Sequence, residues 1–307
     1  MMEPSQYSAE MKLPQVPTGD QVFLDHVGFF TNSQADLSAE LSAFGFNVSQ
    51  VNRQYNSDQD GRMRRAGTSN RLSRFKAGFI EILFADSDTA LSRELQDATN
   101  RHDGLHLIAF SSENLQKKRS QLLEHSFKMA PVVKLERATS DGTVRWSVLR
   151  FEKSTMPEGR IQFAYPHTPK LSWPETELIH KNGVQSLTSV NIITNDKMET
   201  LDRYARFTGR HAKQDVLELD RGCIAVSSSQ DDRTIYRDWV APDAPCIASA
   251  TFATRNIEQL RNVLRRQNVP FFDQGDMVWA GPLAYAKTFI GFHAEGIDIV
   301  GYWKSGK

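Results

Sequence analysis

The chain has 307 residues, and its 37 lysine and arginine side chains equal in number its 37 aspartates and glutamates. This balance gives no reason to expect a nucleic-acid partner or an acidic one. No apolar run approaches the roughly 18 residues that would predict a membrane-spanning helix. The length suffices for one large domain or two ordinary ones.

The first 20 residues are polar and interrupted by prolines. They have neither the basic start nor the apolar core of a signal peptide, so we expect a flexible leader on a cytoplasmic protein. The two cysteines, Cys223 and Cys246, each begin an apolar run and lack zinc-type spacing. We expect both to be small buried side chains in a reducing compartment.

An internal duplication follows the leader. A shift of 81 positions places "FLDHVGFFTNSQADLSAELSAFGF", from Phe23, on "GLHLIAFSSENLQKKRSQLLEHSF", from Gly104. The same shift places "GFIEILF", from Gly78, on "GRIQFAY", from Gly159. An identical offset at both ends of a segment indicates two related units.

Each unit predicts a strand, a helix and further strands. Residues 22–30 are apolar and rich in strand formers, and residues 35–44 place Leu37, Leu41 and Phe44 at helical spacing. "NRLSRFKAG" and "GFIEILF" predict a hairpin that turns at Lys-Ala-Gly. In the second unit, "TVRWSVLRFE" and "GRIQFAY" take these places.

The second half repeats this plan more faintly. We expect a third unit at 186–230, closed by "GCIAVSSS", and a fourth at 245–303, closed by "GIDIVGYW". The proline-rich residues 169–185 predict a linker between the halves. The fold class predicted is therefore α+β, with four βαβββ modules in two pairs.

Glu81, inside "GFIEILF", is a carboxylate in a strand that is otherwise apolar. Such a charge is costly unless something pairs with it. Three partners remain open at this point: a metal ion, a polar cleft in which Glu81 acts as a base, or an arginine such as Arg71 or Arg74.

The chain resembles the vicinal oxygen chelate superfamily, which includes glyoxalase I, extradiol dioxygenases and bleomycin-resistance proteins, and most resembles its glyoxalase-like domains of otherwise unassigned bacterial proteins. The residues that carry this resemblance are "LDHVGFF", "GTSNRLSRFKAGFIEILFA", "RWSVLRFE", "RIQFAYP" and "HKNG". The resemblance implies that each module pair curls into a mostly antiparallel half-barrel sheet around a cleft. The active cleft would belong to the pair at 21–168 (modules 21–86 and 103–168), and 186–307 would be a degenerate pair.

The resemblance also implies metal ligands on the first and last strands of each module. His26 and Glu81 hold these positions in the first module, and Leu107 and Gln162 hold them in the second. His106 is one residue out of phase, so it would face the cleft only if a bulge turned it inward. One divalent ion (zinc, nickel, manganese or iron) is implied, bound by a set drawn from His26, Glu81, Gln162 and His106.

In the second half the positions that correspond to Glu81 carry Ala225 and, one step out of register, Asp298. We therefore expect no second metal site there.

An arginine-rich stretch, "GRMRRAGTSNRLSRFK", would lie at the cleft mouth in the resemblance. It is either a solvated loop and strand face or an electropositive lip for an anionic substrate. The candidate substrate-binding residues are Thr68, Asn70, Arg71, Arg145, Trp146 and His180. Trp146 could equally be core, and Asn182-Gly183 beside His180 also predicts an ordinary turn.

Two functions remain open. The first is a metal-dependent lyase or isomerase with Glu81 as the catalytic residue, acting on a small, oxygen-rich and anionic molecule; dioxygenation has less support because the second pair lacks the ligands. The second is a metal-free protein that binds or sequesters a small molecule, as bleomycin-resistance proteins do. Four units in one chain could form both clefts internally, so either a monomer or a homodimer is expected.

Overall fold

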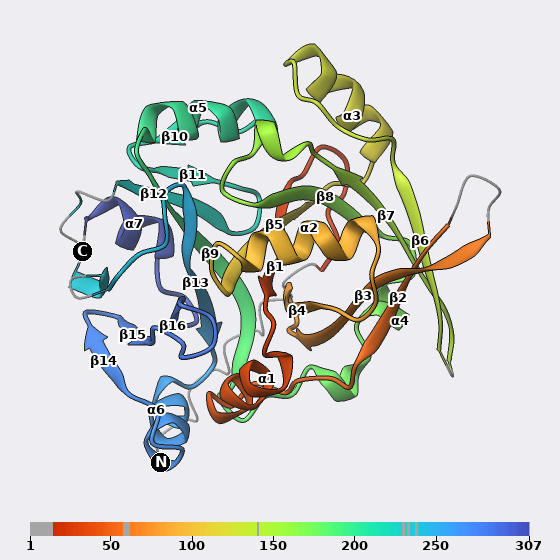
Figure 1. Cartoon of the computed structure of the whole chain (residues 1–307). Coiled ribbons are helices and arrows are strands. Elements are labelled where there is room, and N and C mark those ends of the chain that lie inside the picture. Colours follow the sequence, from red (N-terminus) through yellow and green to blue (C-terminus); the bar gives the residue numbers. More distant parts are fainter. Residues whose placement is uncertain are drawn as a thin grey trace, which may run out of the picture.

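The computed structural model describes residues 15–57, 62–139, 141–228, 231, 234–236 and 239–306. The expected leader at 1–20 lies outside the described residues up to position 14. Two eight-stranded sheets, one from each half of the chain, form the framework, and few helices accompany them (Figure 1). The predicted α+β class with two module pairs is confirmed.

The first sheet joins the first two modules around two central strands. β1 and β5 run antiparallel in the middle, and each lies parallel to the last strand of its own module. The bounds of β5 and β8 are those of β1 and β4 displaced by 81 residues, as the duplication predicts. In spatial order the strands are β2 (Asn52–Ser57), β3 (Met63–Arg74), β4 (Phe79–Ala85), β1 (Phe23–Phe30), β5 (Gly104–Ser111), β8 (Arg160–Pro166), β7 (Gly142–Arg150) and β6 (Val133–Thr139).

Two helices of this half begin at side-chain caps. Thr89 and Ser92 form a reciprocal capping box at the start of α2, and the Asn114 side chain accepts a hydrogen bond from the Lys117 N–H at the start of α3. The predicted helix at 35–44 corresponds to α1. The helical segments are α1 (Gln34–Ala43), α2 (Ala90–Thr99), α3 (Leu115–Glu124), η1 (Lys153–Thr155), α4 (Pro169–Ser172) and η2 (Glu175–Glu177), the last two within the predicted linker.

The second sheet repeats the arrangement of the first, with β9 and β13 in the middle. Its strands, in spatial order, are β10 (Ala212–Lys213), β11 (Val216–Glu218), β12 (Cys223–Ser228), β9 (Val184–Thr194), β13 (Cys246–Thr254), β16 (Phe289–Ala294), β15 (Met277–Ala280) and β14 (Phe271–Gln274). Its helical segments are α5 (Lys197–Thr208), η3 (Thr234–Tyr236), α6 (Ile257–Arg266) and α7 (Ile299–Lys304).

One predicted element of the second half is wrong. "GIDIVGYW" does not close the fourth module as a strand, because Asp298 caps the N-terminus of α7 through a hydrogen bond from the Gly301 N–H. The closing strand is β16, some residues earlier, and it lies parallel to β13. Short apolar runs fit a strand and a buried helix equally well by pattern alone, which explains the error.

The two halves share one hydrophobic core. Phe46 and Phe75 of the first half pack against Phe252 and Phe292 of the second, with ring centroids 5.3–5.9 Å apart. A bridge between Ala77 and Ser186 adds a backbone contact. Because the halves bury one another's apolar faces, the second half supports the first whether or not it has a site of its own.

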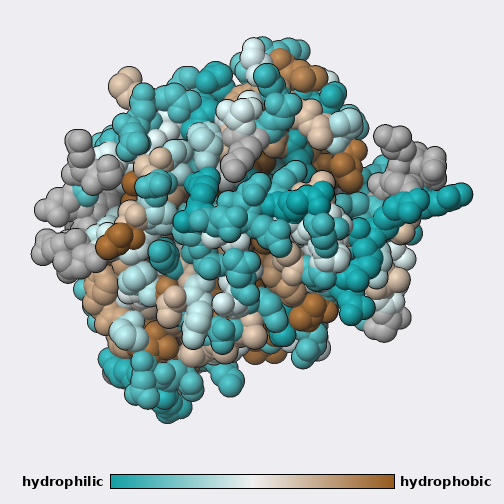
Figure 2. All heavy atoms as spheres, viewed as in Figure 1, coloured by the Kyte–Doolittle hydropathy of each residue, from teal (hydrophilic) through white to brown (hydrophobic). Residues whose placement is uncertain are grey.

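Both cysteines are free and buried, as expected. Burial raises the pKa of the Cys246 thiol to about 12 and that of Cys223 further. None of the helices in the described part of the chain is long and apolar enough to cross a membrane. On the face in Figure 2, hydrophilic residues predominate and hydrophobic ones are scattered.

Candidate active site in the first module pair

A cleft opens on the concave side of the first sheet. The sheet curls so far that its two edge strands, β2 and β6, approach one another across the opening. Side chains from both modules line a cavity of about 170 Å³ between them. Cavities for drug-sized ligands usually measure about 300–1,000 Å³, so this one suits a small molecule.

His26 enters the cleft beside a β-bulge. The ladder between β1 and β5 skips Asp25, because Leu24 pairs with Phe110 and His26 with Ala109. At this irregularity the Asp25 carboxylate lies beside the imidazole of His26, with His26 Nδ1 2.6 Å from Asp25 Oδ2. The imidazole also stacks on Phe79, with ring centroids 4.1 Å apart. Since a carboxylate can only accept, Nδ1 carries the proton that it donates, and Nε2 faces the cleft.

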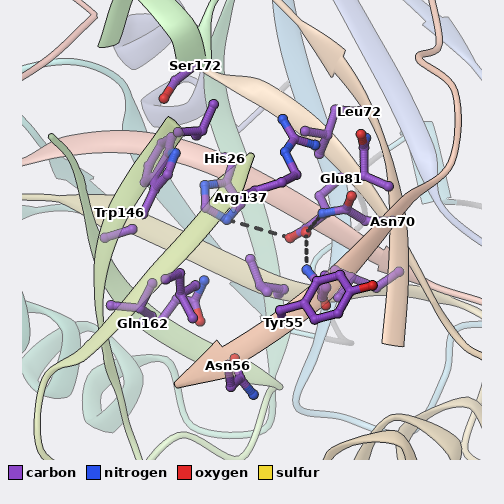
Figure 3. A pocket seen from close by; sticks show the side chains of 18 of the residues that line it. His26, Tyr55, Asn56, Asn70, Leu72, Glu81, Arg137, Trp146, Gln162 and Ser172 are labelled. Carbon is purple, nitrogen blue, oxygen red and sulfur yellow. Dashed lines mark hydrogen bonds and ion pairs between the residues drawn. The ribbon is translucent and has the colours of Figure 1, made fainter. Parts of the chain in front are cut away.

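Glu81 points into the same cleft from β4 (Figure 3). Its Oε1 accepts hydrogen bonds from Asn70 Nδ2 at 2.5 Å and Gln54 Nε2 at 3.3 Å. Its Oε2 lies 3.8 Å from His26 Nε2. Two amide donors therefore fix one oxygen of the carboxylate and leave the other facing the imidazole.

No arginine holds Glu81 by a hydrogen bond or short ion pair within the described residues. Arg71 donates from Nε to Gln34 Oε1, and Arg74 forms an ion pair with Glu177. The alternative in which either arginine neutralises Glu81 directly is therefore not the one observed.

The separation of His26 Nε2 from Glu81 Oε2 fits a shared cation. At 3.8 Å the two atoms are too far apart for a hydrogen bond. Two donors bound at about 2.1 Å to one ion can lie up to about 4.2 Å apart, so an ion fits between them. The carboxylate at His26 Nδ1 is also the usual outer partner of a metal-binding histidine.

The second module contributes only part of a ligand set. Gln162 lines the cleft, and its amide oxygen is a weaker donor than a carboxylate. Leu107 also lines the cleft at the position that corresponds to His26 and offers no donor atom. Within the described ranges, no group of three or more His, Cys, Asp or Glu side chains is placed to hold a metal ion. A bound ion would thus have three protein ligands and open positions.

His106 lies apart from this set. Its neighbour Leu107 faces the cleft, so alternation turns His106 to the opposite face of β5. There its Nε2 lies 2.7 Å from the His102 carbonyl oxygen and its ring lies against that of His102. A second irregularity of the β1–β5 ladder does fall at His106, because Gly28 pairs with Leu107 and Phe29 with Leu105. It does not turn the His106 ring into the cleft, because His106 lines a different cavity.

The predicted substrate-binding residues divide in the same way. Asn70 and Trp146 line the cleft, whereas Thr68 and Arg71 do not. Thr68 donates from its hydroxyl to Gln54 Oε1 at 2.5 Å and so helps to hold that amide. Arg145 is exposed and pairs with Glu136 at 3.1 Å.

His180 has a structural role. Its Nδ1 accepts a hydrogen bond from the Asn47 N–H, and its Nε2 donates to the Arg74 carbonyl oxygen. Burial lowers the pKa of His180 to about 4, so the ring stays neutral in this bridge. It does not line the cleft.

Arginines deeper in the cleft escaped the sequence analysis. Trp146, Val148 and Arg150 alternate along β7 and all line the cavity, as do Arg160 and Gln162 on β8. Period-two spacing from Trp146 and Gln162 could have identified both arginines.

In the described part of the second module pair, an aromatic side chain lies where the first pair has its cleft. Its register aligns Ser189 with His26 and Ala225 with Glu81. Trp303 of α7 fills the space and donates from Nε1 to Ser189 Oγ at 2.7 Å. Tyr302 and Trp279 pack beside Trp303 in the same apolar cluster. The C-terminal helix therefore takes the place that a ligand would occupy.

Two curled module pairs with a cleft lined from the first and last strands define a vicinal oxygen chelate protein. A family model described as "Glyoxalase-like domain" matches residues 24–208. The chain therefore belongs to the glyoxalase-like domain family of this superfamily. No curated protein matches the sequence.

Solved structures share the fold at low sequence identity. A hypothetical protein from Staphylococcus aureus aligns with a TM-score of 0.61 at 11% identity, over 89% of this chain and 99% of the other. A variant of 4-hydroxymandelate synthase from Streptomyces coelicolor aligns with a TM-score of 0.55 at 11% identity, over 89% and 92%. A fusion of a xylose isomerase-like TIM barrel with 4-hydroxyphenylpyruvate dioxygenase gives 0.56 at 10% identity, over 92% of this chain and 50% of that one.

Proposed function

We propose that the protein is a metal-dependent enzyme of the lyase or isomerase type that acts on a small, oxygen-rich, anionic molecule. The observation that carries this proposal is the pairing of His26 Nε2 and Glu81 Oε2 at 3.8 Å, with Asp25 behind the imidazole. At this separation the nitrogen and the carboxylate oxygen are too far apart to share a proton, and a metal ion bound to both would offset the repulsion between their lone pairs. The dioxygenase names among the structural neighbours agree with metal chemistry but do not specify it.

His26, Glu81 and Gln162 would hold the ion, and Asp25 would orient the imidazole. Such an ion, when bound, supplies Lewis-acid stabilisation of negative charge on substrate oxygens. Zinc, nickel, manganese and iron all accept this mixed nitrogen and oxygen donor set.

Glu81 is the buried carboxylate of the cleft and the base in this proposal. Asn70 and Gln54 fix its Oε1, so Oε2 would serve both roles: one of its lone pairs would hold the ion, and the other would take a proton from a substrate carbon. Return of that proton to a neighbouring carbon gives an isomerisation, and departure of a neighbouring group gives an elimination. Trp146 and Phe79, with ring centroids 6.1 Å apart, present an apolar wall that excludes water from one side.

Metal content tests the proposal. Protein purified without an affinity tag or chelator should carry about one equivalent of a transition metal by mass spectrometry. The variants Glu81→Ala and His26→Ala should lose it. Glu136→Ala is the matched control, because Glu136 borders the same cavity but pairs with Arg145 outside it.

If the parent binds no metal after exposure to zinc, nickel, manganese and ferrous iron, the metal mechanism fails. Metal-free binding of a small molecule then becomes the leading account. Leu107 supports this second candidate, because it places an apolar side chain where a fourth ligand would be needed.

A further inference from the structure

We propose that Arg150 and Arg160 form an oxyanion subsite in the cleft, which binds a carboxylate or phosphate group of the substrate. The subsite deepens the proposed function by naming a substrate class, and it stands beside the metal donors rather than among them. It follows from the position, the burial and the unbalanced charge of the two guanidinium groups.

Position places both guanidinium groups next to Gln162. Arg150 is the direct ladder partner of Gln162 across the β7–β8 pair. Arg160 precedes Gln162 by two residues on β8, so both side chains leave the strand on the same face. Both arginines line the cavity that contains His26 and Glu81.

Burial makes these charges costly without an anion. The Arg160 side chain is only 13% exposed, and its guanidinium also lies over the Phe30 ring. Nε of Arg150 is buried and has no hydrogen-bond partner among the described residues. A buried guanidinium that lacks hydrogen-bond acceptors is strongly unfavourable.

The protein provides little negative charge to compensate. Among the described residues, the one ion pair of these two arginines joins Arg160 to Glu94 at 3.6 Å, and the Glu94 side chain is 69% exposed. The Glu81 carboxylate of the same cleft also acts on both guanidinium groups, but through charge alone: within the described residues neither arginine forms a hydrogen bond or short ion pair with it.

Glu94 also approaches from the far side. Arg150 and Arg160 separate the cleft from a second cavity, and Glu94 lines that second cavity but not the cleft. The cleft side of the arginine pair is thus left for a ligand. A planar oxyanion matches the forked geometry of guanidinium donors.

The predicted substrate would reach from the arginine pair to the proposed metal ligands. Its oxyanion would lie against Arg150 and Arg160, and its neighbouring hydroxyl or carbonyl oxygens would face Gln162, His26 and Glu81. A small hydroxy- or oxo-carboxylate has this pattern, and a small phosphate ester has it with a different anion.

Isothermal titration calorimetry on the full chain tests the subsite. The probes are malonate, inorganic phosphate and neutral malonamide, each added to chelator-treated and to metal-loaded protein. We expect malonate or phosphate to bind both forms and malonamide to bind neither. The variants Arg150→Gln and Arg160→Gln should each weaken anion binding about tenfold or more, because each removes charge-assisted hydrogen bonds.

Arg145→Gln is the matched control. Arg145 lies on the same strand as Arg150, but it is exposed and pairs with Glu136 outside the cleft. Its loss should leave anion affinity within about twofold. If a glutamine variant does not fold, Arg150→Lys and Arg160→Lys keep the charge and should still weaken binding, because lysine lacks the planar fork.

The inference is overturned if the parent binds neither anion in either form. It is also overturned if the variants at Arg150 and Arg160 bind as the parent does. Preference for malonate would assign a carboxylate substrate, and preference for phosphate a phosphate ester; either supports the subsite. A protein that binds an anion but takes up no metal under any loading condition would remove the proposed metal role alone, whereas a protein that takes up metal but binds no anion would remove the subsite alone.

Discussion

Replacing Asp25 by asparagine should weaken divalent-metal binding with little effect on the fold. Asp25 lies within 2.6 Å of His26 Nδ1, and the two residues are 0% and 4% exposed. The amide has nearly the same shape as the carboxylate but no charge. It can also turn its NH₂ group toward Nδ1, which would move the imidazole proton to Nε2 and remove the lone pair from the cleft.

The magnitude follows from the type of hydrogen bond that is lost. A buried hydrogen bond to a charged group contributes about 1.5–3 kcal/mol. At about 1.4 kcal/mol for each factor of ten, this corresponds to a loss of roughly 10–150-fold in metal affinity. Changes in the carboxylate partners of metal-binding histidines typically cost about 10–100-fold, so we expect a loss within that range.

Competition with a colorimetric chelator would measure the dissociation constants of the parent and Asp25→Asn. Asp86→Asn is a suitable control, because Asp86 accepts a hydrogen bond from Ser69 and pairs with Arg65 away from the cleft. Thermal unfolding would show that the variants are folded. A folded Asp25→Asn protein that binds metal within about threefold of the parent, while His26→Ala does not bind it, would refute the orienting role of Asp25.

Three further predictions concern stability. Burial lowers the pKa of His180 to about 4 from an unfolded value near 6.5, so the unfolded chain binds the proton more tightly and stability falls as pH drops through this window. Between pH 6.5 and 5, protonation of this residue alone should lower the free energy of unfolding by about 1.6 kcal/mol. In urea unfolding, the His180→Gln variant should lose less stability over this pH range, by that amount. If the variant and the parent have the same pH slope, the assignment is contradicted. Glu158→Gln should lower the free energy of unfolding by about 3 kcal/mol, because buried Arg203 then loses a carboxylate that lies 2.9 Å away. A change below about 1 kcal/mol in urea titrations would count against this role of Glu158. Trp303→Ala should lower the free energy of unfolding by about 3–5 kcal/mol, because the indole ring fills the cleft of the second half above Ser189. The variant should also bind a hydrophobic dye in the space that the ring leaves. A stable variant that binds no dye would show that this cleft closes without Trp303.

Much of the fold could be predicted because it follows from the local periodicity of apolar and polar residues. The shift of 81 residues located both central strands and both closing strands of the first pair, since side-chain alternation within a strand survives duplication. It also aligned His26 with Leu107 rather than His106, and the structure places Leu107 in the cleft. His26 and Glu81 came from the same reasoning together with the family resemblance.

The fourth module shows where local pattern fails. "GIDIVGYW" has the composition of a strand, but β13 already has β16 as its parallel neighbour. The segment instead forms α7, whose Trp303 and Tyr302 complete an apolar cluster over the second sheet. Whether this segment forms a helix or a strand depends on whether a neighbouring strand is free to pair with it, and that is decided by residues far away in the sequence.

The sequence by itself determined the module plan, the buried cysteines and the two strand positions that face each other in the cleft. Only the tertiary structure decided what surrounds them. The bulge at Asp25 places a carboxylate behind His26, alternation on the facing strands brings Arg150 and Arg160 beside Gln162, and α7 closes the second cleft. Strand periodicity is local and can be read from spacing, whereas bulges, facing walls and filled clefts arise from pairing between distant strands, which spacing does not encode.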